Sequence, residues 1–140
     1  MWTCPWCGRT FAARNQTHTC ASLGDLEAHF ARSETSVREA YDAALSVVRA
    51  LGPVEVLAEK SRIAWHVRMS FAAFQPRASW LDGHLVLARE IPSGRWRLEV
   101  YSPRNVLHAF RLLSPADVDD QFAAWLTEAY DVGRQRHLGR

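Results

Sequence analysis

A segment in the middle of the chain alternates in polarity: Arg62-Ile63-Ala64-Trp65-His66-Val67-Arg68-Met69. Successive side chains of a β-strand point to opposite faces, so a period of two is typical of a strand with one buried face. Here the apolar side chains at the odd positions share one face, and the other face carries Arg62, Ala64, His66 and Arg68. The segment therefore predicts a strand with one apolar and one basic face.

A second alternating strand is predicted at residues 95–101. Trp96, Leu98 and Val100 share its apolar face, and the opposite face carries Arg95, Arg97, Glu99 and Tyr101. The turn Pro92-Ser93-Gly94 separates this strand from one predicted at 84–91, and another strand at 106–113 follows the next turn. Weaker strand signals at 54–57 and 71–74 complete an antiparallel sheet.

Two helices flank these strands in the sequence. Ser36 and Glu39 have the spacing of a capping box, and Gly52-Pro53 ends the helix that they begin. Its apolar residues recur at helical spacing: Val37, Ala40, Tyr41, Ala44, Val48 and Leu51. For the last helix, Ser114 is the predicted cap, Pro115 lies in the first turn, and Gly133 marks the end.

This order of elements predicts a two-layer α+β domain at residues 37–133. Both helices should cover one face of the antiparallel sheet and leave the other face partly open. Residues 1–22 are assigned to a zinc finger, 23–36 to a short helix and linker, and 134–140 to a basic tail.

The zinc assignment rests on the spacing of Cys4, Cys7, His18 and Cys20. Two cysteines three residues apart can hold one tetrahedral ion, and four protein ligands make a closed, structural site. A disulfide framework would leave one of the three cysteines unpaired. His18 and Cys20 are two residues apart, a spacing at which side chains diverge in regular structure, so His29 is kept as the alternative fourth ligand.

Charge is distributed unevenly along the chain. Residues 60–111 contain nine basic and three acidic residues, whereas segments 34–59 and 112–140 are each net acidic. Arginine presents a planar fork of donors that suits phosphate or carboxylate. We therefore expect the open sheet face to bind an anionic partner, nucleic acid or another protein, through these residues: Lys60, Arg62, His66, Arg68, Arg95, Arg97 and Tyr101.

Nearly the whole chain resembles bacterial proteins that carry the domain of unknown function 5655, here behind an N-terminal zinc finger. The resemblance rests on Cys4-Pro5-Trp6-Cys7-Gly8-Arg9, Phe11, Gln16, His18 and Cys20, the segment from Asp25 to His29-Phe30, Gly52-Pro53-Val54, Lys60-Ser61-Arg62-Ile63, Trp80-Leu81-Asp82-Gly83-His84-Leu85, Trp125-Leu126 and Glu128-Ala129-Tyr130. It implies an α+β fold with no established activity. Related domains sometimes sit beside predicted nuclease modules, which gives associational support to a nucleic-acid role.

Two other functions stay open. The sequence has no glycine-rich phosphate loop and no nucleophile elbow, but an enzyme could use His66, His84 or His108 near Lys60. An interaction or oligomerisation module would instead bury the open face against a protein. The N-terminus lacks the pattern of a signal peptide, and no apolar run reaches the roughly 18 residues of a membrane span, so a cytoplasmic protein is expected.

Overall fold

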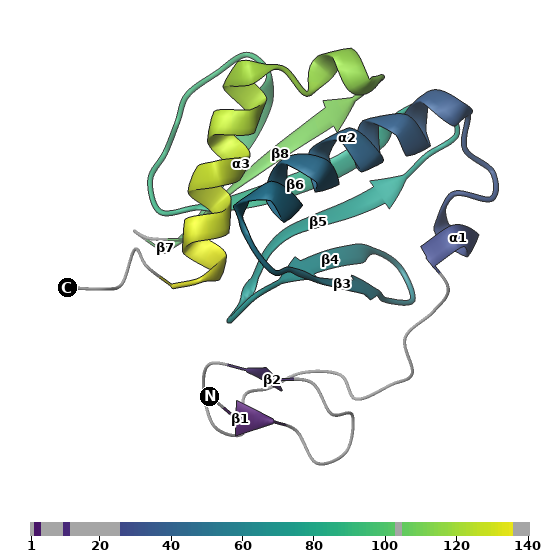
Figure 1. Cartoon of the computed structure of the whole chain (residues 1–140). Coiled ribbons are helices and arrows are strands. Elements are labelled where there is room, and N and C mark those ends of the chain that lie inside the picture. Colours follow the sequence, from purple (N-terminus) through teal and green to yellow (C-terminus); the bar gives the residue numbers. More distant parts are fainter. Residues whose placement is uncertain (1, 4–9, 12–25, 103–104, 136–140) are drawn as a thin grey trace.

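The computed structural model describes residues 2–3, 10–11, 26–102 and 105–135, and in this part of the chain the predicted α+β fold is confirmed (Figure 1). The helical elements are α1 (Leu26–His29), α2 (Thr35–Leu51), the 3-10 turn η1 (Pro115–Asp117) and α3 (Asp120–Gly133). A two-stranded ladder joins β1 (Trp2–Thr3) and β2 (Thr10–Phe11). The main sheet consists of β3 (Glu55–Ala58), β4 (Ile63–His66), β5 (Ser70–Pro76), β6 (Leu81–Leu87), β7 (Trp96–Ser102) and β8 (Asn105–Leu112).

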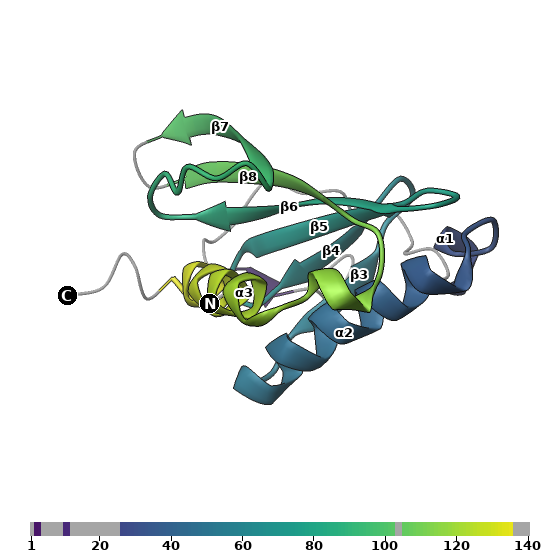
Figure 2. The same ribbon diagram turned by 90° about the horizontal axis from the view of Figure 1, so that it is seen from above.

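All six strands of the main sheet pair antiparallel, in the order β3-β4-β5-β6-β8-β7. The last strand, β8, therefore lies between β6 and β7, and the chain leaving β6 crosses past β8 to reach the edge. Figure 2 shows α2 and α3 together on one side of the sheet. The face away from these two helices is called the open face below.

Aromatic rings fill the space between the helices and the sheet. Tyr41 of α2 meets Trp65 and Phe74 edge to face, with ring centroids 5.6 Å apart in both pairs. Phe71 contacts Tyr130 of α3 in the same manner at 5.7 Å. The indole N–H of Trp65 donates to the Tyr41 hydroxyl at 3.1 Å, which satisfies a polar group that is fully buried.

The apolar face of α2 is as predicted, but its N-terminus is not. Val37, Ala40, Tyr41, Ala44 and Val48 are all buried. The N-cap is Glu34, whose side chain makes no capping bond, and Ser36 lies within the first turn, so the capping box was wrong. A tertiary contact sets the start of this helix, because the backbone N–H of Glu34 donates to the carbonyl of Ala78 at 2.8 Å.

The last helix is interrupted near its start. Ser114 caps only the short turn η1, accepting from the N–H of Ala116 at 3.3 Å. Asp119 then caps α3, accepting from the N–H of Phe122 at 2.9 Å. The predicted end at Gly133 is confirmed. Within the described residues, none of the helices is long and apolar enough to cross a membrane.

The predicted strand at 62–69 is shorter than its alternation. β4 ends at His66, where its pairing with β5 is irregular. Arg68 and Met69 instead donate their backbone N–H groups to the carbonyl of Gly133, at 2.8 and 3.1 Å. Arg68 therefore lies in a turn that joins the sheet to the end of α3.

Candidate functional site

A row of mostly small side chains crosses the open face from strand to strand. The register places Ala64 of β4 opposite Ala73 of β5, Ala73 opposite His84 of β6, His84 opposite Ala109 of β8, and Ala109 opposite Arg97 of β7. These five residues are called the floor row. Because three of them are alanines, the centre of the face is lower than its margins.

This face is hollowed into a concavity of about 840 Å³. Its floor includes Ala73, His84 and Ala109, and its charged lining consists of four arginines and two carboxylates: Arg62, Arg95, Arg97, Arg111, Asp82 and Glu99. Cations therefore outnumber anions two to one around a floor of small side chains.

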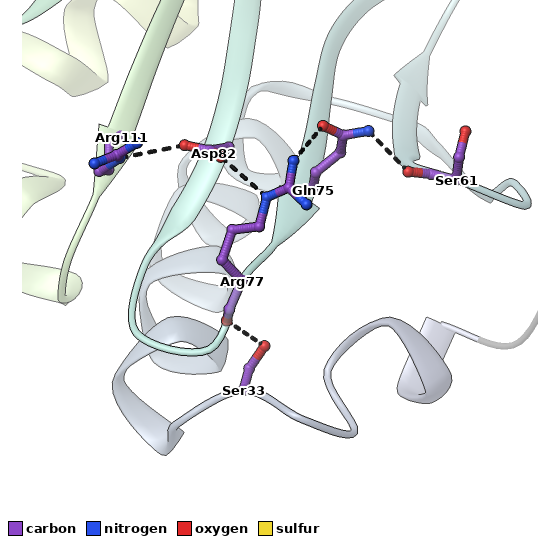
Figure 3. A network of polar contacts seen from close by, with 6 residues as sticks. All are labelled: Ser33, Ser61, Gln75, Arg77, Asp82 and Arg111. Atoms are coloured by element: carbon purple, nitrogen blue, oxygen red, sulfur yellow. Dashed lines mark hydrogen bonds and ion pairs between the residues drawn. The ribbon is translucent and has the colours of Figure 1, made fainter.

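A polar row runs parallel to the floor row, and Figure 3 shows it centred on Asp82. Arg77 and Arg111 donate to the two carboxylate oxygens of Asp82 at 3.1 and 3.3 Å, and Arg77 also donates to Gln75 at 3.3 Å. Burial raises the pKa of Asp82, but hydrogen bonds from Arg77 and Arg111 outweigh burial and hold the pKa below its ordinary value. Asp82 is therefore a carboxylate that offsets part of the positive charge.

Arg111 has a second contact that fixes its position. Its guanidinium lies over the ring of Trp80, with 4.2 Å between the central carbon and the ring centroid. Ion pairing and stacking together orient the planar group at the margin of the concavity.

His84 is the titratable group at the centre of the floor row. Burial, followed by the positive charge of Arg62, lowers the pKa of His84 from 6.5 to about 4. The ring is therefore neutral near pH 7, with one nitrogen that donates and one that accepts. Among the described residues, no hydrogen bond occupies either ring nitrogen, and the flanking residues on the neighbouring strands are alanines.

The family model for a domain of unknown function, DUF5655, matches residues 26–133. The chain belongs to this family. The match begins at the first residue of α1 and ends at the last residue of α3, so it includes the whole six-stranded sheet and the concavity. No curated protein and no solved structure matches the chain.

Three of the sequence-predicted anion-binding residues line the concavity of the DUF5655 domain: Arg62, Arg95 and Arg97. Arg62 donates to a carboxylate oxygen of Glu59 at 2.8 Å. Arg97 is exposed, and no ion pair within the described residues engages its side chain. Among the arginines that line the concavity, Arg97 is therefore the one without an ion pair in the described part of the chain.

Arg95 reaches the rim of the concavity but is held by α3. Its guanidinium donates to the carboxylate of Asp119 at 2.9 and 3.1 Å and to the carbonyl of Asp117 at 2.7 Å. It also lies 5.5 Å from the ring centroid of Trp125. Arg95 therefore lines the same concavity as Arg97, but its guanidinium is engaged by Asp119 and Asp117 beside the N-terminus of α3.

The other predicted residues lie elsewhere. Arg68 is in the turn after β4, and Lys60 is exposed in the turn between β3 and β4. His66 was predicted to present its ring to a partner, but it is only 3% exposed and therefore does not. The side chain of Tyr101 lies outside the described residues, as do the zinc-ligand candidates Cys4, Cys7, His18 and Cys20.

His84 and His108 do not converge. His84 pairs with Ala109, so the neighbouring residue His108 points to the opposite face of the sheet. His108 is completely buried, and its Nε2 accepts from the N–H of Ile91 at 3.1 Å.

The alternative zinc ligand His29 has its Nε2 2.7 Å from the carbonyl oxygen of Glu59. In the described part of the chain, no group of three or more His, Cys, Asp or Glu residues could hold a metal ion.

Arg111 and Asp82 were not among the residues predicted from the sequence. The strand at 106–113 was predicted, and its alternation already places Ala109 and Arg111 on one face and Phe110 and Leu112 on the other. The signal became clear only when the register aligned Arg111 with Asp82 on β6.

Proposed function

We propose that the DUF5655 domain of this chain is a non-enzymatic binding module whose open face takes an anionic partner, and that this partner is nucleic acid. The observation that carries the proposal is the concavity of about 840 Å³, which four arginines and two carboxylates line around a floor of small side chains. Positive groups around a hollow attract and orient an anion, and arginine forks match phosphate oxygens.

The state of the individual arginines supports a phosphate backbone as the partner. Arg97 is exposed without an ion pair among the described residues, and Arg111 is held flat by Trp80. Arg97 can add a phosphate contact without first losing an internal ion pair, and Arg111 donates only its Nε–H to Asp82 within the described residues. Nucleic-acid binding of this kind depends on salt, because each phosphate contact releases condensed counterions.

A catalytic role receives less support from the geometry. The enzymatic hypothesis placed strand histidines near Lys60, whereas His84 and His108 project from opposite faces of the sheet. His108 already accepts a hydrogen bond from the backbone of Ile91. Binding is therefore the function that the arrangement of side chains favours.

The test is binding of labelled single- and double-stranded DNA and RNA at low and at higher salt. We expect binding that weakens steeply with salt and is reduced about tenfold or more by Arg97→Glu, since charge reversal replaces an attraction with a repulsion. Arg49→Glu is the matched control, because Arg49 is an exposed residue in the last turn of α2, on the helix side of the molecule. No binding at low salt, or equal losses in both variants, would contradict the proposal and favour a protein partner.

The zinc finger is a second part of the proposal. Cys4, Cys7, His18 and Cys20 are the ligands that we infer for one structural zinc ion, on the strength of their spacing in the sequence. A closed four-ligand site would stabilise residues 1–22 without taking part in chemistry.

A further inference from the structure

The open face contains a neutral hydrogen-bonding group between cations, and this arrangement is more specific than positive charge alone. His84 occupies the centre of the floor row, and its ring is neutral near pH 7 because its pKa is about 4. A phosphate or carboxylate would favour a charged imidazole. The neutral ring is better suited to a neutral polar group that both accepts and donates hydrogen bonds.

The cations lie on both sides of this ring across the sheet. Arg97 is on β7, two strands from His84, and Arg62 directly precedes β4, two strands away in the other direction. Neighbouring strands are about 4.8 Å apart, so the backbone of each arginine lies roughly 10 Å from the backbone of His84, measured across the strands. A ligand that crosses the strands would meet a cation, a neutral ring and a second cation in turn.

The floor has room for a planar ring. Ala73 and Ala109 flank His84 on the neighbouring strands, and neither side chain extends beyond a methyl group. The concavity of about 840 Å³ lies within the range of sites that enclose small molecules, roughly 300–1,000 Å³. The imidazole is partly exposed and lines the concavity, so a ring that lies on the floor can reach it.

From this juxtaposition we propose that the floor row binds an unpaired base of a single-stranded nucleic acid. The His84 ring hydrogen-bonds to the edge of the base, and Arg62 and Arg97 contact the phosphates on its two sides. A single strand presents the same order of groups as the face does: phosphate, base, phosphate. A duplex does not, because its base edges are paired, whereas single strands can splay their bases out to proteins. This proposal rests on the proposed function and adds the class of nucleic acid and the residue that reads it.

The experiment compares an ordinary single strand with an abasic strand of the same length, using the full chain and fluorescence anisotropy. A base contact of this kind changes affinity by about tenfold, so the wild type should prefer the base-containing strand by that factor. His84→Leu should reduce the preference to near unity, whereas Arg49→Glu should keep it. Ala109→Leu, which fills the floor beside His84, should also abolish the preference.

The outcomes distinguish a failure of this proposal from a failure of the proposed function on which it rests. If neither strand binds at low salt, the proposed function fails. If both strands bind the wild type equally, or His84→Leu retains the full preference, the base site is wrong while anion binding stands. His84→Gln keeps a donor and an acceptor in nearly the same volume, and it should retain part of the preference that His84→Leu loses. Circular dichroism of each variant confirms that it is folded before binding is compared.

Discussion

Gly133 shows how closely single residues of the last helix approach the sheet. A Cβ atom built on Gly133 would lie 2.9 Å from Cγ of Phe71 and closer still to Cδ1 of the same ring. Phe71 is fully buried and cannot move aside without displacing its neighbours, among them Tyr130 and Trp65. The carbonyl of Gly133 also accepts two backbone hydrogen bonds from the turn after β4. The absence of a side chain at Gly133 is therefore a requirement of packing.

Gly133→Ala should lower the free energy of unfolding, although alanine is the better helix former. Helix propensity favours alanine by about 1 kcal/mol, but overpacking a filled core costs about 1–3 kcal/mol. Urea denaturation of the variant measures the difference. The matched control is Gly94→Ala, because nothing lies within 4 Å of a Cβ at Gly94 and little change is expected there. A Gly133→Ala protein as stable as the wild type would contradict this packing.

Strand β8 contacts the segment that joins β6 to β7 through one buried side chain, His108. His108 of β8 is completely buried, and its ring accepts from the N–H of Ile91 at 3.1 Å. Its other nitrogen donates to the carbonyl of Val106 at 3.0 Å, and the ring packs against Trp96 at 4.4 Å. Both hydrogen bonds require the neutral tautomer with the proton on Nδ1.

Stability should therefore fall as pH decreases from neutral toward the mildly acidic range. Burial lowers the pKa of His108, and burial with Arg62 lowers that of His84 from 6.5 to about 4. In the window between about 4 and 6.5 the unfolded chain binds more protons than the folded chain, so the free energy of unfolding rises with pH there. Urea midpoints at several pH values within and above that window check this prediction. His84→Gln should reduce the slope, and an unchanged or inverted slope in the wild type would contradict it.

The elements also show what local sequence can predict. Alternation correctly placed Ile63 and Trp65 against the helices, because burial on one face enforces a period of two. Alternation also placed Arg95 on the face of Arg97, but it could not indicate the ion pair with Asp119, which is 24 residues away in the chain. Alternation could not predict the position of β8 between β6 and β7 either, because strand order depends on long-range pairing. Arg62 and Arg97 were predicted for the site, whereas the central role of His84 emerged only from the register.

Acidic and basic segments of the chain lie on opposite sides of the sheet. The net-acidic segments 34–59 and 112–140 supply α2 and α3 on one side of the sheet, and the basic middle of the chain supplies the lining of the open face. Among the described residues, every member of the main core cluster lies between Phe30 and Tyr130. This described core is therefore built from residues of the DUF5655 domain.

Removing zinc should leave that core intact. We expect one zinc ion per chain by elemental analysis and its loss in Cys7→Ser, because zinc contributes on the order of 10 kcal/mol to folding in such small modules. After chelation the helical circular dichroism should persist, since α2 and α3 pack on the sheet through residues outside the finger. Purified protein without zinc would contradict the ligand assignment, and a global loss of helix would contradict the independence of the core.

If the open face of the sheet is the binding surface, titration with a short single-stranded oligonucleotide should change the backbone amide chemical shifts of that face. We predict that the shifts cluster on the strands beneath the concavity, including Ala73, His84, Arg97 and Ala109, and that exposed positions of α2 such as Arg49 do not move. Changes confined to α2 and α3, or none on the floor row at saturation, would show that the open face is not the binding surface.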